Sequence, residues 1–201
     1  MKTNYRLHIF FLVFMFLAQE SAILGQPKFR NKEEGKMFYE TLLKKDSNDA
    51  VAHFNYANLL YFEFNDIRAA KFHYEKSLEI DPHNAYEHHH YAAFIEKEFN
   101  DIKAAKKHYE LALLINPKDF VWHFSYANFL EDKFNDFQGA KRHYEMALAI
   151  SPNDAIVNFA YAVMLQTKLR KPPEARKHYL IAIHHDPNLK SEETVEIFGI
   201  K

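Results

Sequence analysis

The chain contains no cysteine among its 201 residues. This absence excludes disulfide bonds, thiolate metal sites and a cysteine nucleophile. Only four glycines are present, so few turns need a positive φ angle, which favours helices joined by short polar connections. The formal net charge of -1 provides no global attraction to nucleic acid or to an anionic membrane surface. No Asn-x-Ser/Thr sequence occurs, which favours a cytoplasmic location.

One phrase is repeated along the chain. The segment NDIRAAKFHYEKSLEIDP at 65–82 returns with small changes at 100–117 and 135–152, and in a looser form at 170–187. The period is 35 residues, and it places alanines, tyrosines and prolines in register (Ala70, Ala105, Ala140, Ala175; Tyr74, Tyr109, Tyr144, Tyr179; Pro82, Pro117, Pro152, Pro187). A fixed period of this length is typical of stacked helical repeats.

The second half of each period has the spacing of an amphipathic helix. In the first copy Ile67, Ala70, Tyr74 and Leu78 lie on one helical face. The apolar stripe is wide, which indicates packing against two neighbours rather than one. An aspartate precedes each of the first three such helices as a predicted N-cap (Asp66, Asp101, Asp136). The proline that closes the phrase ends the helix.

The first half of each period predicts another helix. It begins at a residue that favours the N-cap position (Asp49, Asn84, Asp119, Asp154). Small residues such as Ala57 lie where this helix must approach Ala70 of the next one. A helix–turn–helix of this kind cannot bury both apolar faces alone, so the copies are expected to stack. The predicted fold is all-α, an α-solenoid of antiparallel helix-turn-helix repeats.

The pattern Ala70-x3-Tyr74-x2-Ser77-Leu78-x3-Pro82 resembles the tetratricopeptide repeat. The resemblance covers residues 49–187 as four repeats, approximately 49–83, 84–118, 119–153 and 154–188. The repeat departs from the family in two ways. It is one residue longer than the usual length of about 34, with the extra residue expected late in the first helix. In three copies a histidine stands where the family often has tryptophan (His53, His88, His123).

The two ends of the chain flank this array. Residues 35–49 align one period before 70–84, which predicts the second helix of a degenerate repeat within 27–48. The apolar segment 1–26 is either a degenerate first helix or a signal peptide, and the protein is secreted if residues 1–25 are that signal. Its apolar run is too short for a stable membrane span. Residues 189–201 are expected to form a capping segment in which Phe198 covers the last repeat.

No catalytic or metal-binding pattern is recognisable. There are thirteen histidines, but the neighbouring His88, His89 and His90 point in different directions on a helix, and no His-x3-His pair occurs. Equivalent histidines of successive repeats, such as His73 and His108, would lie roughly 10 Å apart. Neither a glycine-rich phosphate loop nor a nucleophile elbow is present. We therefore expect no enzyme activity, no metal and no cofactor.

The resemblance implies a scaffold or adaptor for protein–protein interaction. In the family the first helices line a concave groove that receives a partner peptide or helix. The corresponding positions here are Val51, Phe54, Asn58, Tyr86, His89, Ala93, Val121, Phe124, Asn128, Ile156, Phe159 and Val163. Many of them are apolar, so they either receive an apolar partner or pack between neighbouring first helices.

Some partners are less expected than others. Family members that hold the acidic C-termini of chaperones use a clamp of basic residues and asparagines. Asn58 matches one clamp asparagine, but Phe54, Val121 and Ser125 stand where basic residues are needed, so carboxylate-clamp binding is not expected. Two other functions remain open, a self-associating structural array and an RNA-binding helical-repeat module. The near-zero net charge argues against the second, and the sequence does not identify a protein partner.

Overall fold

The computed structural model describes residues 27–200. Within this range the chain forms helices and no β-strand, which confirms the predicted all-α fold of helical repeats. The predictions of a signal peptide or a degenerate first helix in residues 1–26 lie outside the described residues. The chain divides into two compact units, and the boundary between them falls between Pro117 and Lys118.

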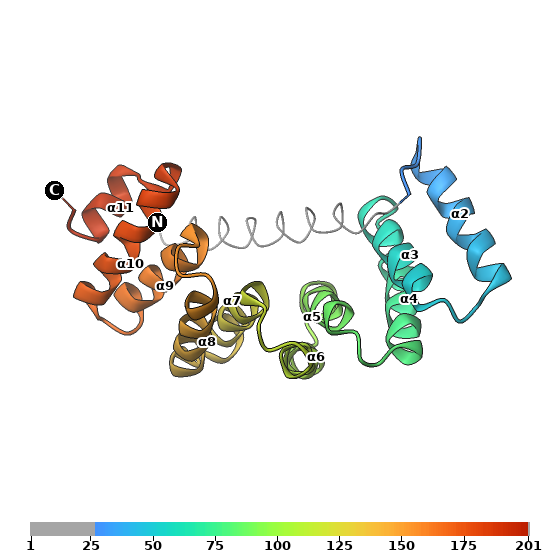
Figure 1. The fold of residues 1–201 in the computed structure, drawn as a ribbon, viewed down its shortest axis with the longest axis horizontal. Helices are drawn as coiled ribbons and strands as arrows, with labels where there is room; N and C mark the ends of the chain where they lie inside the picture. The colour runs from blue at the N-terminus through green and yellow to red at the C-terminus, as the bar shows by residue number, and fades with distance from the viewer. Residues whose placement is uncertain (1–26, 201) are drawn as a thin grey trace. The chain divides into compact units, whose positions relative to one another are not determined.

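The unit that precedes this boundary contains two complete helical hairpins (Figure 1). Helix α3 packs against α4, and α5 packs against α6, while α2 lies against α3. The helices are α2 (Lys32–Lys45), α3 (Ala50–Phe62), α4 (Ile67–Ile80), α5 (Ala85–Phe99) and α6 (Ile102–Ile115).

The unit that follows the boundary also contains two hairpins and ends in a short helix (Figure 1). Helix α7 packs against α8, and α9 packs against α10. The elements are α7 (Phe120–Phe129), the π-helix η1 (Leu130–Phe134), α8 (Phe137–Ile150), α9 (Ala155–Thr167), α10 (Pro172–His185), the 3₁₀-helix η2 (Pro187–Leu189) and α11 (Glu192–Ile197).

The predicted N-caps are present. The side chain of Asp66 accepts a hydrogen bond from the backbone N–H of Ala69 at 3.0 Å, and the other N-cap residues act in the same way (Asp49, Asn84, Asp101, Asp119, Asp136, Asp154). The last second helix instead begins with Pro172 in its first turn, where the missing N–H costs nothing.

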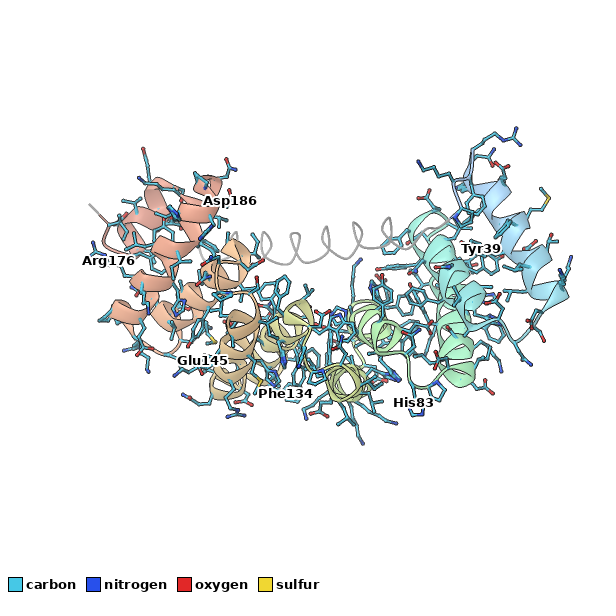
Figure 2. The ribbon with its side chains drawn as sticks, in the orientation of Figure 1. Tyr39, His83, Phe134, Glu145, Arg176 and Asp186 are labelled. Carbon is cyan, nitrogen blue, oxygen red and sulfur yellow. The ribbon has the colours of Figure 1, made fainter. Side chains whose placement is uncertain are left out.

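Small and aromatic side chains hold the helices together. Ala57 and Ala70 have no exposed surface, so α3 and α4 approach closely. A tyrosine on each of α3, α5 and α9 also contacts the helix that precedes it in the chain. Its hydroxyl donates to a glutamate carboxylate in three places, Tyr56 to Glu40 at 3.1 Å, Tyr91 to Glu75 at 2.8 Å and Tyr161 to Glu145 at 3.1 Å. Figure 2 draws the side chains on the ribbon and labels Tyr39, whose ring stacks on that of Tyr56.

The turn between the two helices of a hairpin explains the unusual repeat length. Its central residue has a positive φ in every copy: 53° at Asn65, 50° at Asn100, 51° at Asn135 and 53° at Arg170. The next backbone N–H then bonds to a carbonyl six residues back, as from Asp66 to Leu60 at 2.9 Å, which is one residue more than a Schellman cap spans. In the third copy the π-helix η1 widens the last turn of the first helix, which is where the sequence predicted the extra residue.

Helix α11 closes the second unit. Ser191 caps it in a reciprocal capping box with Thr194. The hydroxyl of Thr194 is 2.6 Å from that of Tyr179, and Phe198 stacks on Tyr179 with ring centroids 4.3 Å apart. Phe198 is only 5% exposed, because its ring lies against Tyr179 of α10.

Candidate interaction surface of the first helices

Six of the predicted groove residues lie on α3 and α5 of the first unit. Val51 is 62% exposed, and Tyr86 and Ala93 are half-buried. Phe54 and His89 are buried. The sixth residue, Asn58, is buried too, and its Oδ1 accepts a hydrogen bond from the Tyr74 hydroxyl at 2.5 Å.

Phe54 belongs to an aromatic cluster rather than to an open surface. Its ring centroid lies 5.6 Å from those of Tyr74 and Tyr86 and 5.7 Å from that of His90. The rings of Tyr86 and His90 are themselves only 4.1 Å apart. Burial lowers the pKa of His90 to about 4, so this histidine is neutral at pH 7 and the cluster carries no charge.

The other six predicted groove residues lie on α7 and α9 of the second unit. Val121, Phe124 and Phe159 are buried, whereas Asn128, Ile156 and Val163 are half-buried. The Tyr144 hydroxyl donates to Asn128 Oδ1 at 2.6 Å.

The amide nitrogen of Asn128 differs from the oxygen beside it. Within residues 27–200, Asn128 Nδ2 is buried and has no hydrogen-bond partner. A buried donor without an acceptor is costly, and a partner on the surface does not reach this nitrogen. Asn128 is thus a polar position on an otherwise apolar helix face.

The burial pattern separates the twelve residues into two groups. The three phenylalanines are buried, Phe54 between its own hairpin and the next first helix, and Phe124 and Phe159 against a tyrosine of their own hairpins, which favours the packing interpretation for them. Val51, Tyr86, Ala93, Ile156 and Val163 keep exposed apolar surface on the first helices.

The structure gives no basic clamp at the family's carboxylate-binding positions. Phe54, Val121 and Ser125 are all buried, and none of them carries a charge. The Asn58 oxygen is already occupied by Tyr74. An acidic C-terminus would therefore find no cation at these positions.

Pairs of histidines form a site that the sequence analysis did not predict. The Nδ1 atoms of His53 and His73 are 2.8 Å apart, and the same contact is repeated in the next two copies, between His88 and His108 at 2.9 Å and between His123 and His143 at 3.0 Å. The contact does not join histidines one period apart but crosses the hairpin at a separation of 20 residues. The signal was present in the sequence, because histidine occurs at both positions in the same three copies.

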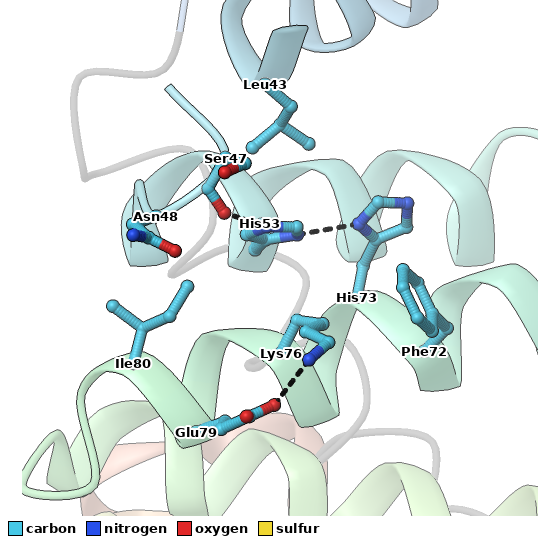
Figure 3. A pocket seen from close by; sticks show the side chains of 9 residues that line it. All are labelled: Leu43, Ser47, Asn48, His53, Phe72, His73, Lys76, Glu79 and Ile80. Atoms are coloured by element: carbon cyan, nitrogen blue, oxygen red, sulfur yellow. Dashed lines mark hydrogen bonds and ion pairs between the residues drawn. The ribbon is translucent and has the colours of Figure 1, made fainter. Parts of the chain in front are cut away.

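A cavity of about 630 Å³ opens beside the first of these pairs (Figure 3). Leu43, Phe72 and Ile80 give it an apolar wall. Its rim carries an ion pair between Lys76 Nζ and Glu79 Oε2, 2.6 Å apart.

Within residues 27–200 no cluster of three or more His, Cys, Asp or Glu side chains is placed to hold a metal ion. No helix of that range is long and apolar enough to cross a membrane.

Comparison with known proteins identifies the type of repeat. Residues 50–84 match the family model of the tetratricopeptide repeat. No match was found among curated proteins.

Several solved structures share the fold. The PilF protein of Pseudomonas aeruginosa has a TM-score of 0.70 at 20% sequence identity, with 96% of this chain and 80% of PilF covered. A crystal structure of MamA has a TM-score of 0.68 at 16% identity, with coverages of 78% and 90%. YrrB, described as a tetratricopeptide repeat protein with an unusual peptide-binding site, has a TM-score of 0.67 at 21% identity, with coverages of 81% and 80%. At these identities the similarity concerns the fold.

The 35-residue pattern, the stacked helical hairpins and the match over residues 50–84 agree with one another, and the described part of the chain has the fold of tetratricopeptide repeat proteins.

Proposed function

We propose that this protein is a non-enzymatic scaffold whose first helices bind an apolar peptide or helix of a partner protein. Tetratricopeptide repeat proteins in general bind protein partners through such surfaces. The observation that carries the proposal is the apolar surface left on the first helices, above all Val51, which is 62% exposed although most of α3 is buried.

The chemistry of this surface defines the partner. Tyr86, Ala93, Ile156 and Val163 add further apolar area, and no predicted groove residue is acidic or basic apart from the buried His89. Burial lowers the pKa of His89 well below its ordinary value, so it is neutral as well. A partner should therefore bind through apolar side chains. The peptide-binding site named for YrrB offers a precedent on the same fold.

The proposal is tested by selecting peptides from a displayed library on the full-length chain and measuring their affinity by fluorescence polarisation. Val51→Asp should weaken binding at least tenfold if the peptide uses α3, and Ile156→Asp if it uses α9, while the circular dichroism spectrum is unchanged. Leu114→Asp is the matched control, because Leu114 is 76% exposed on a second helix. Equal affinity for both surface variants and the control would contradict the proposal.

A second candidate function is self-association. It is favoured by α2, where the neighbouring apolar side chains of Met37 and Phe38 are 64% and 43% exposed, since exposed apolar patches mark association surfaces. Light scattering of the full-length chain should then report a mass above that of the monomer, and Met37→Asp should restore the monomer. A monomeric full-length chain would exclude this function.

A further inference from the structure

Three copies of the repeat bring two imidazole rings together head to head. The Nδ1 atoms are 2.8, 2.9 and 3.0 Å apart, and the ring centroids are 5.0, 5.0 and 5.2 Å apart. These two sets of distances place both nitrogens of a pair near the line that joins the rings. The N–H of one ring therefore points straight at the lone pair of the other, as Figure 3 shows for His53 and His73.

A backbone carbonyl fixes the tautomer of the first histidine. His53 Nε2 is 3.2 Å from the Ser47 carbonyl oxygen, and His88 Nε2 is 3.0 Å from that of Pro82. Because a carbonyl only accepts, Nε2 must carry the hydrogen and Nδ1 must present its lone pair to the second histidine. Proteins orient metal-binding histidines in the same way, with the remote ring N–H held by a carbonyl or carboxylate.

We propose that each of these three histidine pairs is a two-coordinate site for a soft monovalent cation such as Cu(I). Ions of this d¹⁰ class favour two ligands in line, which is the direction in which the two Nδ1 atoms face each other. Zinc needs four ligands in a tetrahedron, and no cluster of three metal-binding side chains exists in residues 27–200. The geometry thus selects the linear ion.

Binding replaces the proton that bridges the pair. The hydrogen on Nδ1 of the second histidine leaves, and the Nε2 of the same ring takes one up, so the number of bound protons is unchanged. Both Nδ1 lone pairs then bind the cation, and the site gains one positive charge. With nitrogen–metal bonds of about 2 Å the two nitrogens must separate to about 4 Å.

The surroundings allow this movement. The two rings belong to different helices, and both His53 and His73 line the 630 Å³ cavity, which gives the ion a route to the first pair. His108 and His143 are half-buried, so the other pairs also reach solvent. The chain has no cysteine, whose thiolate would bind a soft cation more strongly.

The fourth repeat supplies a natural control. Asparagine takes the place of the first histidine there, and Asn158 Oδ1 is 2.8 Å from His178 Nδ1. An amide therefore forms the same contact without offering a second nitrogen lone pair. Substitution of His53, His88 and His123 by asparagine copies an arrangement that the fold already contains.

The experiment is a calorimetric titration of the full-length chain with silver nitrate in chloride-free buffer, since Ag(I) has the same linear preference and is stable in air. Three equivalents should bind tightly and raise the melting temperature. The variant H53N/H88N/H123N should lose all three equivalents and the rise, whereas Asn158→His should gain a fourth.

Two results would overturn the proposal. One is a triple variant that binds the same number of tight equivalents as the original chain. The other is a rise in melting temperature with zinc sulfate that equals or exceeds the rise with silver, because linear sites should not prefer zinc.

Discussion

At the residue scale, one turn position departs from its three equivalents. Asn65, Asn100 and Asn135 adopt the left-handed conformation, which asparagine tolerates, but the fourth copy has Arg170 with a φ of 53°. An ordinary L-residue in this region costs about 1–2 kcal/mol. The strain is local, because the turn hydrogen bond from the Lys171 N–H to the Leu165 carbonyl is kept at 2.9 Å.

We therefore expect Arg170→Asn to raise the free energy of unfolding by about 1 kcal/mol. Urea denaturation followed by circular dichroism measures the change. The converse variant, Asn65→Ala, should lower stability by a similar amount and serves as its control. An Arg170→Asn chain that is less stable than the original would contradict this account of the turn.

Glu87 is the second residue that stands apart. Ser77 Oγ lies 2.7 Å from the Ala50 carbonyl oxygen and 2.5 Å from Glu87 Oε2. The hydroxyl has one hydrogen, so the carboxyl of Glu87 donates to Ser77 if Ser77 donates to Ala50. Burial raises the pKa of Glu87 to about 7, which agrees with a protonated carboxyl.

This raised pKa has a defined effect on stability. The folded state holds the Glu87 proton up to about pH 7, whereas an unfolded glutamate releases its proton at about pH 4.3. The stability that the proton contributes is complete below the unfolded pKa and is lost as the pH rises through the folded one.

Glu87→Gln keeps the donor at every pH, so its melting temperature relative to the original chain should increase between pH 5 and pH 8. Thermal unfolding of both chains in matched buffers measures this difference. A difference that does not change with pH would show that Glu87 is ionised throughout the range.

At the element scale, the histidine pairs couple the two helices of a hairpin to pH. A pair keeps its Nδ1–Nδ1 hydrogen bond when it binds one proton, and loses the bond when both rings are protonated. Burial and the nearby first histidine lower the pKa of His73 and of His108 to about 4. Tyr56 packs against His73, and Lys76 and Glu79 face it across the cavity.

These lowered pKa values determine how the stability of the fold changes with pH. Unfolded histidines bind protons below about pH 6.5, while His73 and His108 stay neutral until about pH 4. Stability is therefore fully present above the unfolded pKa and is lost as the pH falls through this window.

We expect the melting temperature to fall between pH 6.5 and pH 4, and to fall less steeply in the variant H53N/H88N/H123N. In that variant a protonated second histidine can still donate to the asparagine oxygen. Equal slopes for the two chains would contradict a role of the pairs in acid unfolding.

Helix α11 gives a further prediction at this scale. Phe198 stacks on Tyr179 and is 5% exposed, so Phe198→Ala removes a buried ring from the end of the array. We expect a loss of about 3 kcal/mol. Hydrogen exchange should become faster in α10 and α9 before it changes in α3 and α4, since each repeat of a solenoid is stabilised mainly by its neighbours. A uniform increase along the chain would contradict this nearest-neighbour behaviour.

At the scale of the whole molecule, each unit repeats the same construction. Alanines allow the helices of a hairpin to approach, and tyrosine–glutamate bonds join one hairpin to the next. Such a design leaves the first helices free to differ in their exposed residues, which is where the proposed partner binds.

The sequence by itself determined the fold class, the helix starts and the repeat type. These depend on local chemistry, such as the cap at Asp66 and the spacing of Ala70 and Tyr74, and a period of 35 residues presents each signal several times. The groove positions follow from the resemblance, by their place on the first helix, and they stay a prediction.

Only the tertiary structure decided which of those residues are exposed and which histidines meet. Phe54 and Val51 are both apolar and three residues apart, yet packing against Tyr74 buries the first and leaves the second 62% exposed. The contact between His53 and His73 depends on how far one helix slides along another and how each ring turns. Local sequence does not encode these quantities, because they are set by the summed packing of both helices against their neighbours.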